Sequence, residues 1–149
     1  MAVSEARTSA GTTISIGSAA PSNYTQVAYE ALTYTLVSEV TDIGEFGREY
    51  TLVTHNPIGD RGTVKRKGSF NDGALALQMA RVPDNAGQAA VIAARDVDVS
   101  YGWKIVYPDG TIGYFAAQTM SYTTNVGNVD QIWAASVNVE IDSGSYIEV

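Results

Sequence analysis

Apolar and polar residues alternate along much of the chain with a period of two, the pattern of a β-strand with one buried and one solvated face. The clearest case is residues 133–142, whose apolar register begins at Trp133 and is expected to face a core. A second run, residues 99–107, ends at Pro108-Asp109-Gly110, which suits a tight turn. Further strands are expected at residues 12–16, 32–41, 50–55, 63–67, 74–81 and 111–123.

Residues 84–96 are the one stretch with the character of a helix. Pro83, Asp84 and Asn85 can begin a helix, and Asn85 followed by Gln88 three residues later approximates a capping box. The alanines that follow favour helix, and their spacing predicts a stripe of small side chains that packs closely on a sheet. The stripe consists of Ala86, Ala89, Ala90, Ala93 and Ala94.

Residues 41–73 are too long for an ordinary hairpin connection and are punctuated by glycines between short strand-like pieces. Such an excursion predicts a projecting arm whose partner lies outside its own subunit. The whole pattern predicts a single domain over residues 1–149, with an N-terminal arm (1–11), an extended loop (41–73) and a C-terminal tail (145–149). The expected fold is mainly β: a β-sandwich or partial barrel with one flanking α-helix and a long projecting loop.

The charge of the chain argues against a nucleic-acid-binding protein. With nine basic and sixteen acidic residues the net charge is −7, whereas phosphate binding needs concentrated Lys and Arg. Four of the nine basic residues nevertheless lie within seven positions: Arg61, Lys65, Arg66 and Lys67. The absence of cysteine excludes disulfides and thiolate metal sites, and the absence of a long apolar run predicts neither a signal peptide nor a membrane span.

Catalytic chemistry is poorly represented. His55 is the only histidine, so neither a Cys–His pair nor a multi-histidine metal site is possible, and no serine stands in a nucleophile elbow. The pairs Asp96-x-Asp98 and Glu140-x-Asp142 could form a cation site or an acid/base pair on one strand face, but solvated strands produce the same pattern. We therefore predict no enzyme, no metal site and no cofactor.

Three stretches carry a resemblance to a known family: "GEFGREYTLVTHNPIGDRGTVKRKGSFNDGALALQMARVPDNAGQAAVIAA" (44–94), the "YPDG" hairpin (107–110) and "VGNVDQIWAASVNVEIDSG" (126–144). Together they resemble the major tail tube protein of long-tailed bacteriophages with non-contractile tails, over roughly residues 33–144. The resemblance implies a β-sandwich with one helix, six copies to a ring, and rings stacked into a tube through which DNA leaves the capsid. The type VI secretion tube protein shares this architecture.

The resemblance also implies partners and a location. The chain is expected in the virion tail, made and assembled in the host cytoplasm, with copies of itself, a tape measure protein and a tail terminator as partners. DNA passes through the lumen without specific binding, and no membrane is involved. If the polar face of residues 133–142 lines the bore, its charge repels DNA. The candidates for this wall are Glu39, Ser136, Asn138, Glu140 and Asp142.

The basic cluster is expected to meet an acidic surface on the next copy, where complementary charge mainly sets register and encounter rate. On a strand, Lys65 and Lys67 share one face and Arg66 lies on the other. The candidates for subunit or ring contacts are Asp42, Glu45, Arg48, Glu49, His55, Arg61, Lys65, Arg66 and Lys67. A solvated edge strand, protected by its lysines, is the alternative for the cluster.

Other functions compete with a tube protein. A tail terminator or head–tail adaptor would form one closed ring, and a type VI secretion-like protein would form a tube of another system. An enzyme or sugar-binding module on a β-sandwich would require a concave site.

Overall fold

The structure is a computed structural model that describes residues 4–149, so the first three residues of the expected N-terminal arm lie outside the described residues. Within residues 4–149, ten strands and two helices follow one another. They are β1 (Thr13–Gly17), α1 (Gln26–Glu30), β2 (Tyr34–Leu36), β3 (Val40–Asp42), β4 (Glu49–His55), β5 (Val64–Asn71), β6 (Ala74–Ala80), α2 (Ala86–Arg95), β7 (Tyr101–Val106), β8 (Ile112–Asn125), β9 (Ala134–Ile141) and β10 (Ile147–Glu148).

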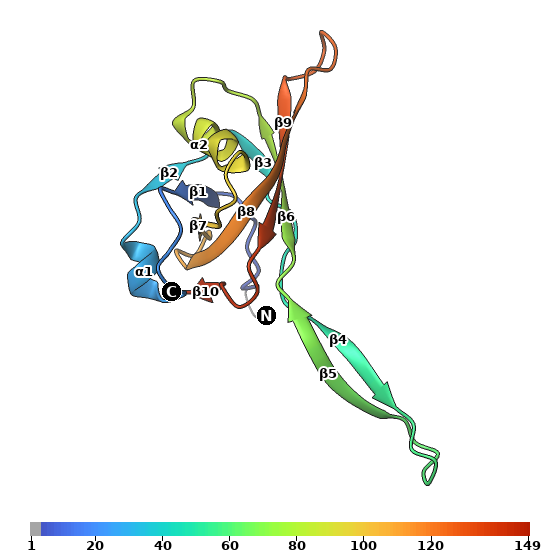
Figure 1. The fold of residues 1–149 in the computed structure, drawn as a ribbon. Helices are drawn as coiled ribbons and strands as arrows, with labels where there is room; N and C mark the ends of the chain where they lie inside the picture. Colours follow the sequence, from blue (N-terminus) through green and yellow to red (C-terminus); the bar gives the residue numbers. More distant parts are fainter. Residues whose placement is uncertain (1–3) are drawn as a thin grey trace.

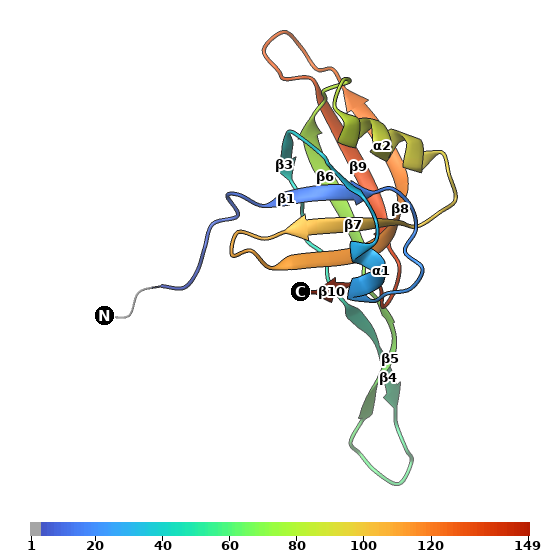
Figure 2. The same ribbon diagram turned by 90° about the vertical axis from the view of Figure 1, so that its left-hand side faces the viewer.

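The main sheet has the strand order β2-β1-β7-β8-β9-β6-β3, with β10 added beside β8, and its pairs are antiparallel. The long strand β8 joins the two halves of the sheet, because its first part pairs with β7 and its second part with β9. A register shift between Thr119 and Ser121 lets both Thr119 and Tyr122 face the interior. The sheet folds over a core, as Figures 1 and 2 show, and the predicted mainly β sandwich with a flanking helix is confirmed.

Large apolar side chains from both halves of the sheet fill the core. Trp103 and Phe115 stack with ring centroids 6.2 Å apart, and both are fully buried. On β9 the predicted alternation holds, with Val137 and Val139 among the buried positions. Trp133, expected to begin this buried register, instead precedes the strand and is 41% exposed.

Helix α2 lies within the predicted range, and Asn85 caps it by accepting a hydrogen bond from the Gln88 backbone N–H at 3.0 Å. The expected capping box forms only in this direction. The Gln88 side chain is buried and instead donates to the Ser38 and Ala80 carbonyls, at 3.0 and 2.9 Å. Its amide oxygen accepts from the backbone N–H of Val82, so that this side chain ties α2 to the end of β6 and to the β2–β3 connection.

The predicted alanine stripe is wrong for three of its five members. Ala86, Ala89 and Ala93 are exposed and Ala90 is half-buried, whereas the buried apolar side chains of α2 are Val91 and Ala94. The close approach is made by Gly87, where an added Cβ would collide with the backbone carbonyl of Leu36. This contact fixes the rotation of the helix and turns Ala86, Ala89 and Ala93 toward solvent.

Two further expectations are corrected. The strand expected over residues 32–41 is divided into β2 and β3, with Glu39 between them at φ 61°, a left-handed conformation that is uncommon outside glycine. The break carries the chain from one edge of the main sheet to the other. Helix α1, capped by the Thr25 side chain, and the short strand β10 were not expected from the sequence.

Strands β4 and β5 form a separate two-stranded antiparallel sheet. Figure 1 shows this ribbon projecting from the sandwich, at the end opposite to the β8–β9 turn, and Figure 2 shows the N-terminal segment leaving the body in another direction. We call residues 49–71 the arm. Most of the expected extended loop is thus a regular hairpin.

Candidate subunit interface

The arm exposes large apolar side chains on both of its faces. Tyr50, Leu52, Val53, Ile58 and Phe70 are between 39% and 107% exposed. Neither strand belongs to the main sheet, and each packs mainly against the other. An isolated two-stranded ribbon is marginally stable in water, and clustered exposed apolar side chains mark an interaction surface.

One face of the arm combines aromatic and cationic groups. The rings of Tyr50 and Phe70 lie 5.6 Å apart, and the Lys67 ammonium lies 4.8 Å from the Tyr50 centroid. Cross-strand pairing places Leu52 opposite Lys67 and Thr54 opposite Lys65, so both lysines lie on this face. We call it the lysine face. A one-residue bulge in β5 brings Phe70 to the same side.

Arg66 pairs with Val53 on the opposite face. The division of the cluster that strand alternation predicted is therefore present. Arg61 lies in the exposed turn between the two strands, and His55, at the end of β4, is exposed and pairs with Val64. Six of the nine contact candidates lie on the arm: Glu49, His55, Arg61, Lys65, Arg66 and Lys67.

The other three candidates lie at the end of β3 or between β3 and the arm. Asp42 accepts a hydrogen bond from the Gly44 backbone N–H at 2.8 Å, and Glu45 is exposed. The guanidinium of Arg48 lies 4.1 Å from the Phe70 centroid, and its Nε donates to Asp72 Oδ1 at 3.0 Å. This hydrogen bond raises the pKa of Arg48.

Asp72 anchors the base of the arm, although sequence reasoning did not select it. Its carboxylate is buried, and besides Arg48 it accepts a hydrogen bond from the Gly144 backbone N–H at 2.6 Å. One side chain thus links the arm, the segment that precedes it and the turn after β9. The sequence feature that could have identified Asp72 is an acidic residue directly before a glycine. Gly73 has a φ of 85° and forms the turn where β5 passes into β6.

The lumen candidates are only partly brought together. Ser136, Asn138 and Glu140 share the less buried face of β9, where Glu140 is exposed and Ser136 donates to Gln78 Oε1 at 2.7 Å. Asp142 follows the strand and accepts from the Tyr24 hydroxyl at 3.3 Å. Glu39 does not join them, because the break between β2 and β3 places it at a different surface.

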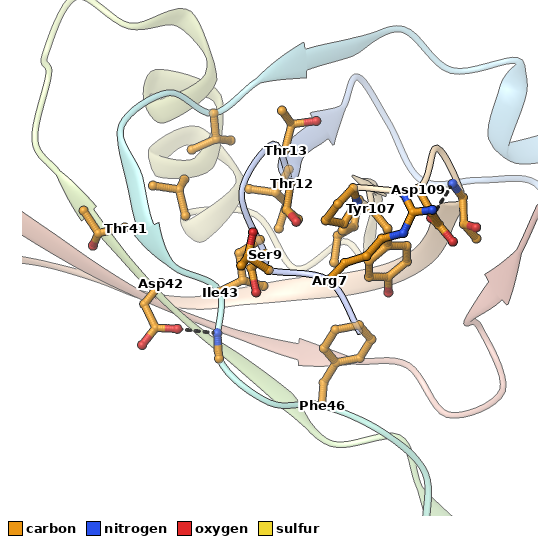
Figure 3. A pocket seen from close by; sticks show the side chains of 18 of the residues that line it. Arg7, Ser9, Thr12, Thr13, Thr41, Asp42, Ile43, Phe46, Tyr107 and Asp109 are labelled. Atoms are coloured by element: carbon orange, nitrogen blue, oxygen red, sulfur yellow. Dashed lines mark hydrogen bonds between the residues drawn. The ribbon is translucent and has the colours of Figure 1, made fainter. Parts of the chain in front are cut away.

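That surface is a groove of about 1080 Å³ between the N-terminal segment, the β2–β3 connection and the β7–β8 turn, shown in Figure 3. Apolar side chains such as Ile14, Ile43 and Phe46 line it together with hydroxyl groups. One basic residue, Arg7, contributes to the lining. Five carboxylates do so: Glu5, Glu39, Asp42, Asp109 and Glu148.

Three of these carboxylates are held by hydrogen bonds. Besides Asp42, Asp109 accepts from the Thr111 backbone N–H at 2.9 Å, a bond that lowers the pKa of Asp109 and favours its charged form. Glu148 accepts from the Tyr146 hydroxyl at 2.8 Å. Because that hydroxyl has a single proton, the 2.6 Å contact between the Tyr107 and Tyr146 oxygens requires Tyr107 to donate. The groove is thus acidic and partly preorganised.

The connection between β8 and β9 is a second exposed apolar feature. Val126, Val129 and Ile132 are 66%, 97% and 80% exposed, at the end of the molecule opposite to the arm (Figure 1). Arg81 lies 5.2 Å from the Trp133 centroid at its base. Sequence reasoning did not select this turn, although apolar residues between glycine and asparagine in a turn are an available signal.

The Asp96 and Asp98 pair does not lie on one face of a strand, although the sequence predicted this. Asp96 and Asp98 lie in the turn after α2 and not on a strand, and Asp96 instead pairs with Arg95 at 3.1 Å. Within residues 4–149 no group of three His, Cys, Asp or Glu side chains could hold a metal ion. In the same part of the chain, no helix has the length and apolar character needed to cross a membrane.

Among the solved structures that share this fold are two from phage-like particles. One is a chain of the anti-feeding prophage baseplate, solved by cryo-EM with sixfold symmetry: it is 10% identical, with a TM-score of 0.74 over 99% of this chain and 97% of that chain. The other belongs to the cryo-EM structure of an extracellular contractile injection system, the PVC sheath/tube terminator in the extended state. It is 12% identical, with a TM-score of 0.72 over 99% of both chains.

No protein-family model matches the sequence, and no curated protein matches it. These likenesses support a phage-tail-type fold. They do not support the narrower resemblance to tube proteins of non-contractile tails, and the second neighbour comes from a contractile system.

Proposed function

We propose that the chain is a structural subunit of a phage-type tail, which assembles with copies of itself into sixfold rings that stack into a tube for DNA ejection. The arm carries this proposal. It holds exposed apolar side chains on a ribbon that lacks the support of a larger sheet, and a neighbouring copy would cover them. The sixfold symmetry of one fold neighbour supports the ring. This role needs no catalytic residue and no cofactor.

The bore of such a tube would be lined by the polar face of β9. Ser136, Asn138 and Glu140 lie on this face, and the strands on both sides present further polar groups there, Gln78 on β6 and Gln118 on β8. Repeated around a ring, the face is polar with a regularly spaced negative charge. Like charge prevents DNA from adhering to it. A tape measure protein inside the tube and a terminator at its end are the expected partners in the virion.

A second function is favoured by one observation. The PVC chain that shares the fold over its whole length is described as a sheath/tube terminator. A terminator forms a single ring at the end of a tube and does not continue it. Both functions require association of copies, and they differ in whether rings stack.

Electron microscopy of the purified protein, across a range of concentration and salt, separates these outcomes. Tubes of variable length support the tube subunit, and uniform single rings support the terminator. A matched variant replaces residues 50–70 by a short Gly-containing turn and leaves the Arg48–Asp72 contact in place. We expect it to remain folded and to lose assembly. Monomers under every condition for the unaltered protein would contradict both functions.

A further inference from the structure

The charges of the molecule are divided between the arm and the rest. The arm has four basic and two acidic side chains and a net charge of +2, whereas the remaining residues have five basic and fourteen acidic ones and a net charge of −9. A basic ribbon on an acidic protein has complementary surfaces on other copies of the same chain. Such complementarity steers association and selects the register of the contact.

Among the acidic surfaces, the groove of Figure 3 matches the arm in a second respect. Its lining includes apolar side chains such as Ile43 and Phe46 beside the five carboxylates. The lysine face presents the counterpart: Leu52 is 62% exposed opposite Lys67, Lys65 lies two residues before Lys67 on β5, and Tyr50 and Phe70 form a ring pair on the same face. The lysine face thus offers apolar and cationic groups, and the groove offers apolar and anionic ones.

The arm is directed away from the body that holds its own groove (Figures 1 and 2). We propose that the lysine face of one copy docks into the acidic groove of a neighbouring copy. Arm and groove are different surfaces, so the contact is heterologous and repeats from copy to copy, closing into rings or continuing between them. This inference rests on the proposed function and specifies the surface that receives the arm.

A charge exchange tests the pairing. The double substitution K65E with K67E reverses the charge of the lysine face. It is expected to raise the concentration needed for assembly roughly tenfold, because that factor corresponds to the loss of two partly exposed ion pairs. Reversing the groove by E5K with E39K should have a similar effect. These two carboxylates are chosen because Asp42, Asp109 and Glu148 accept hydrogen bonds that hold loops.

Combining the four substitutions restores opposite charges across the contact and should return assembly to within about threefold of the unaltered protein. The control D84K with D98K makes the same change of net charge outside the groove and should have little effect. Circular dichroism and thermal melting verify that each variant is folded. Groove variants that assemble normally, or four substitutions without rescue, would overturn the docking and leave the proposed function standing.

Cross-linking tests the same contact by position. The chain has no cysteine, so T54C on the lysine face and T41C in the groove introduce single thiols. Oxidation of an equimolar mixture under assembly conditions should give a heterodimer linked through arm and groove. V126C on the β8–β9 turn replaces T41C as the control. A dimer formed with V126C and not with T41C overturns the docking, and failure of the unaltered protein to associate at all overturns both proposals.

Discussion

Removal of the Asp72 carboxylate tests how the arm is held on the sandwich. Asp72 is 4% exposed and accepts hydrogen bonds from Arg48 Nε at 3.0 Å and the Gly144 N–H at 2.6 Å. Hydrogen bonds to a charged group contribute about 1.5–3 kcal/mol each. The hydrogen bond from Arg48 contributes less than that range, because the Arg48 side chain is 42% exposed and water screens the pair.

The two contributions give about 2–3 kcal/mol of lost unfolding free energy for Asp72→Ala. At ~2–4 °C per kcal/mol for a domain of this size, the melting temperature should fall by about 4–12 °C. Arg48→Ala removes only the exposed bond and the stacking on Phe70, so we expect a clearly smaller loss of stability than for Asp72→Ala. Urea denaturation followed by circular dichroism measures both free energies of unfolding. Equal effects of the two substitutions, or a loss below ~0.5 kcal/mol for Asp72→Ala, would refute this account of the anchor.

Three further predictions concern the core and the helix. Gly87→Ala should lower the free energy of unfolding by about 1–3 kcal/mol, because the added Cβ meets the Leu36 backbone. Alanine favours helix over glycine by about 1 kcal/mol, so a melting temperature that rises in this variant would contradict the close approach. Ala93→Leu should change the melting temperature little, since Ala93 is exposed, and a large fall would show that the residue is buried in solution. Burial raises the pKa of Tyr29 and Tyr34 above the ordinary value of 10.0, so their contribution to stability is fully present below pH 10 and is lost as the pH rises above it. Absorbance at 295 nm during an alkaline titration should show that these phenols ionise only when the protein unfolds. Ionisation of both near pH 10 in the folded protein would contradict the prediction.

Period-two alternation predicted the strands well wherever one face of the strand is buried. Residues 134–141 and 74–80 are strands with a partner on each side in the main sheet, and their buried positions repeat strictly. The expected strand over 32–41 failed for a tertiary reason. The chain must cross between two edges of the sheet there, and Glu39 adopts a left-handed conformation that no alternation pattern encodes.

The helix shows the limit of composition. Its position followed from Asn85 and the alanines, but its orientation depends on where Leu36 lies in space, which the local sequence does not contain. In the same way, the basic cluster predicted a charged contact, whereas the groove that matches it combines five carboxylates from segments far apart in the chain: Glu5, Glu39, Asp42, Asp109 and Glu148. The buried anchor Asp72 was missed because its partners, Arg48 and Gly144, are also distant in the sequence.

A cryo-EM reconstruction of the assembled protein would show its symmetry, the wall of the bore and the contacts of the arm together. We expect stacked rings of six copies, in which Ser136, Asn138 and Glu140 face the bore and each arm lies on a neighbouring copy. An assembly with Glu140 on its outer surface, or one in which the arm is free in solvent, would contradict it.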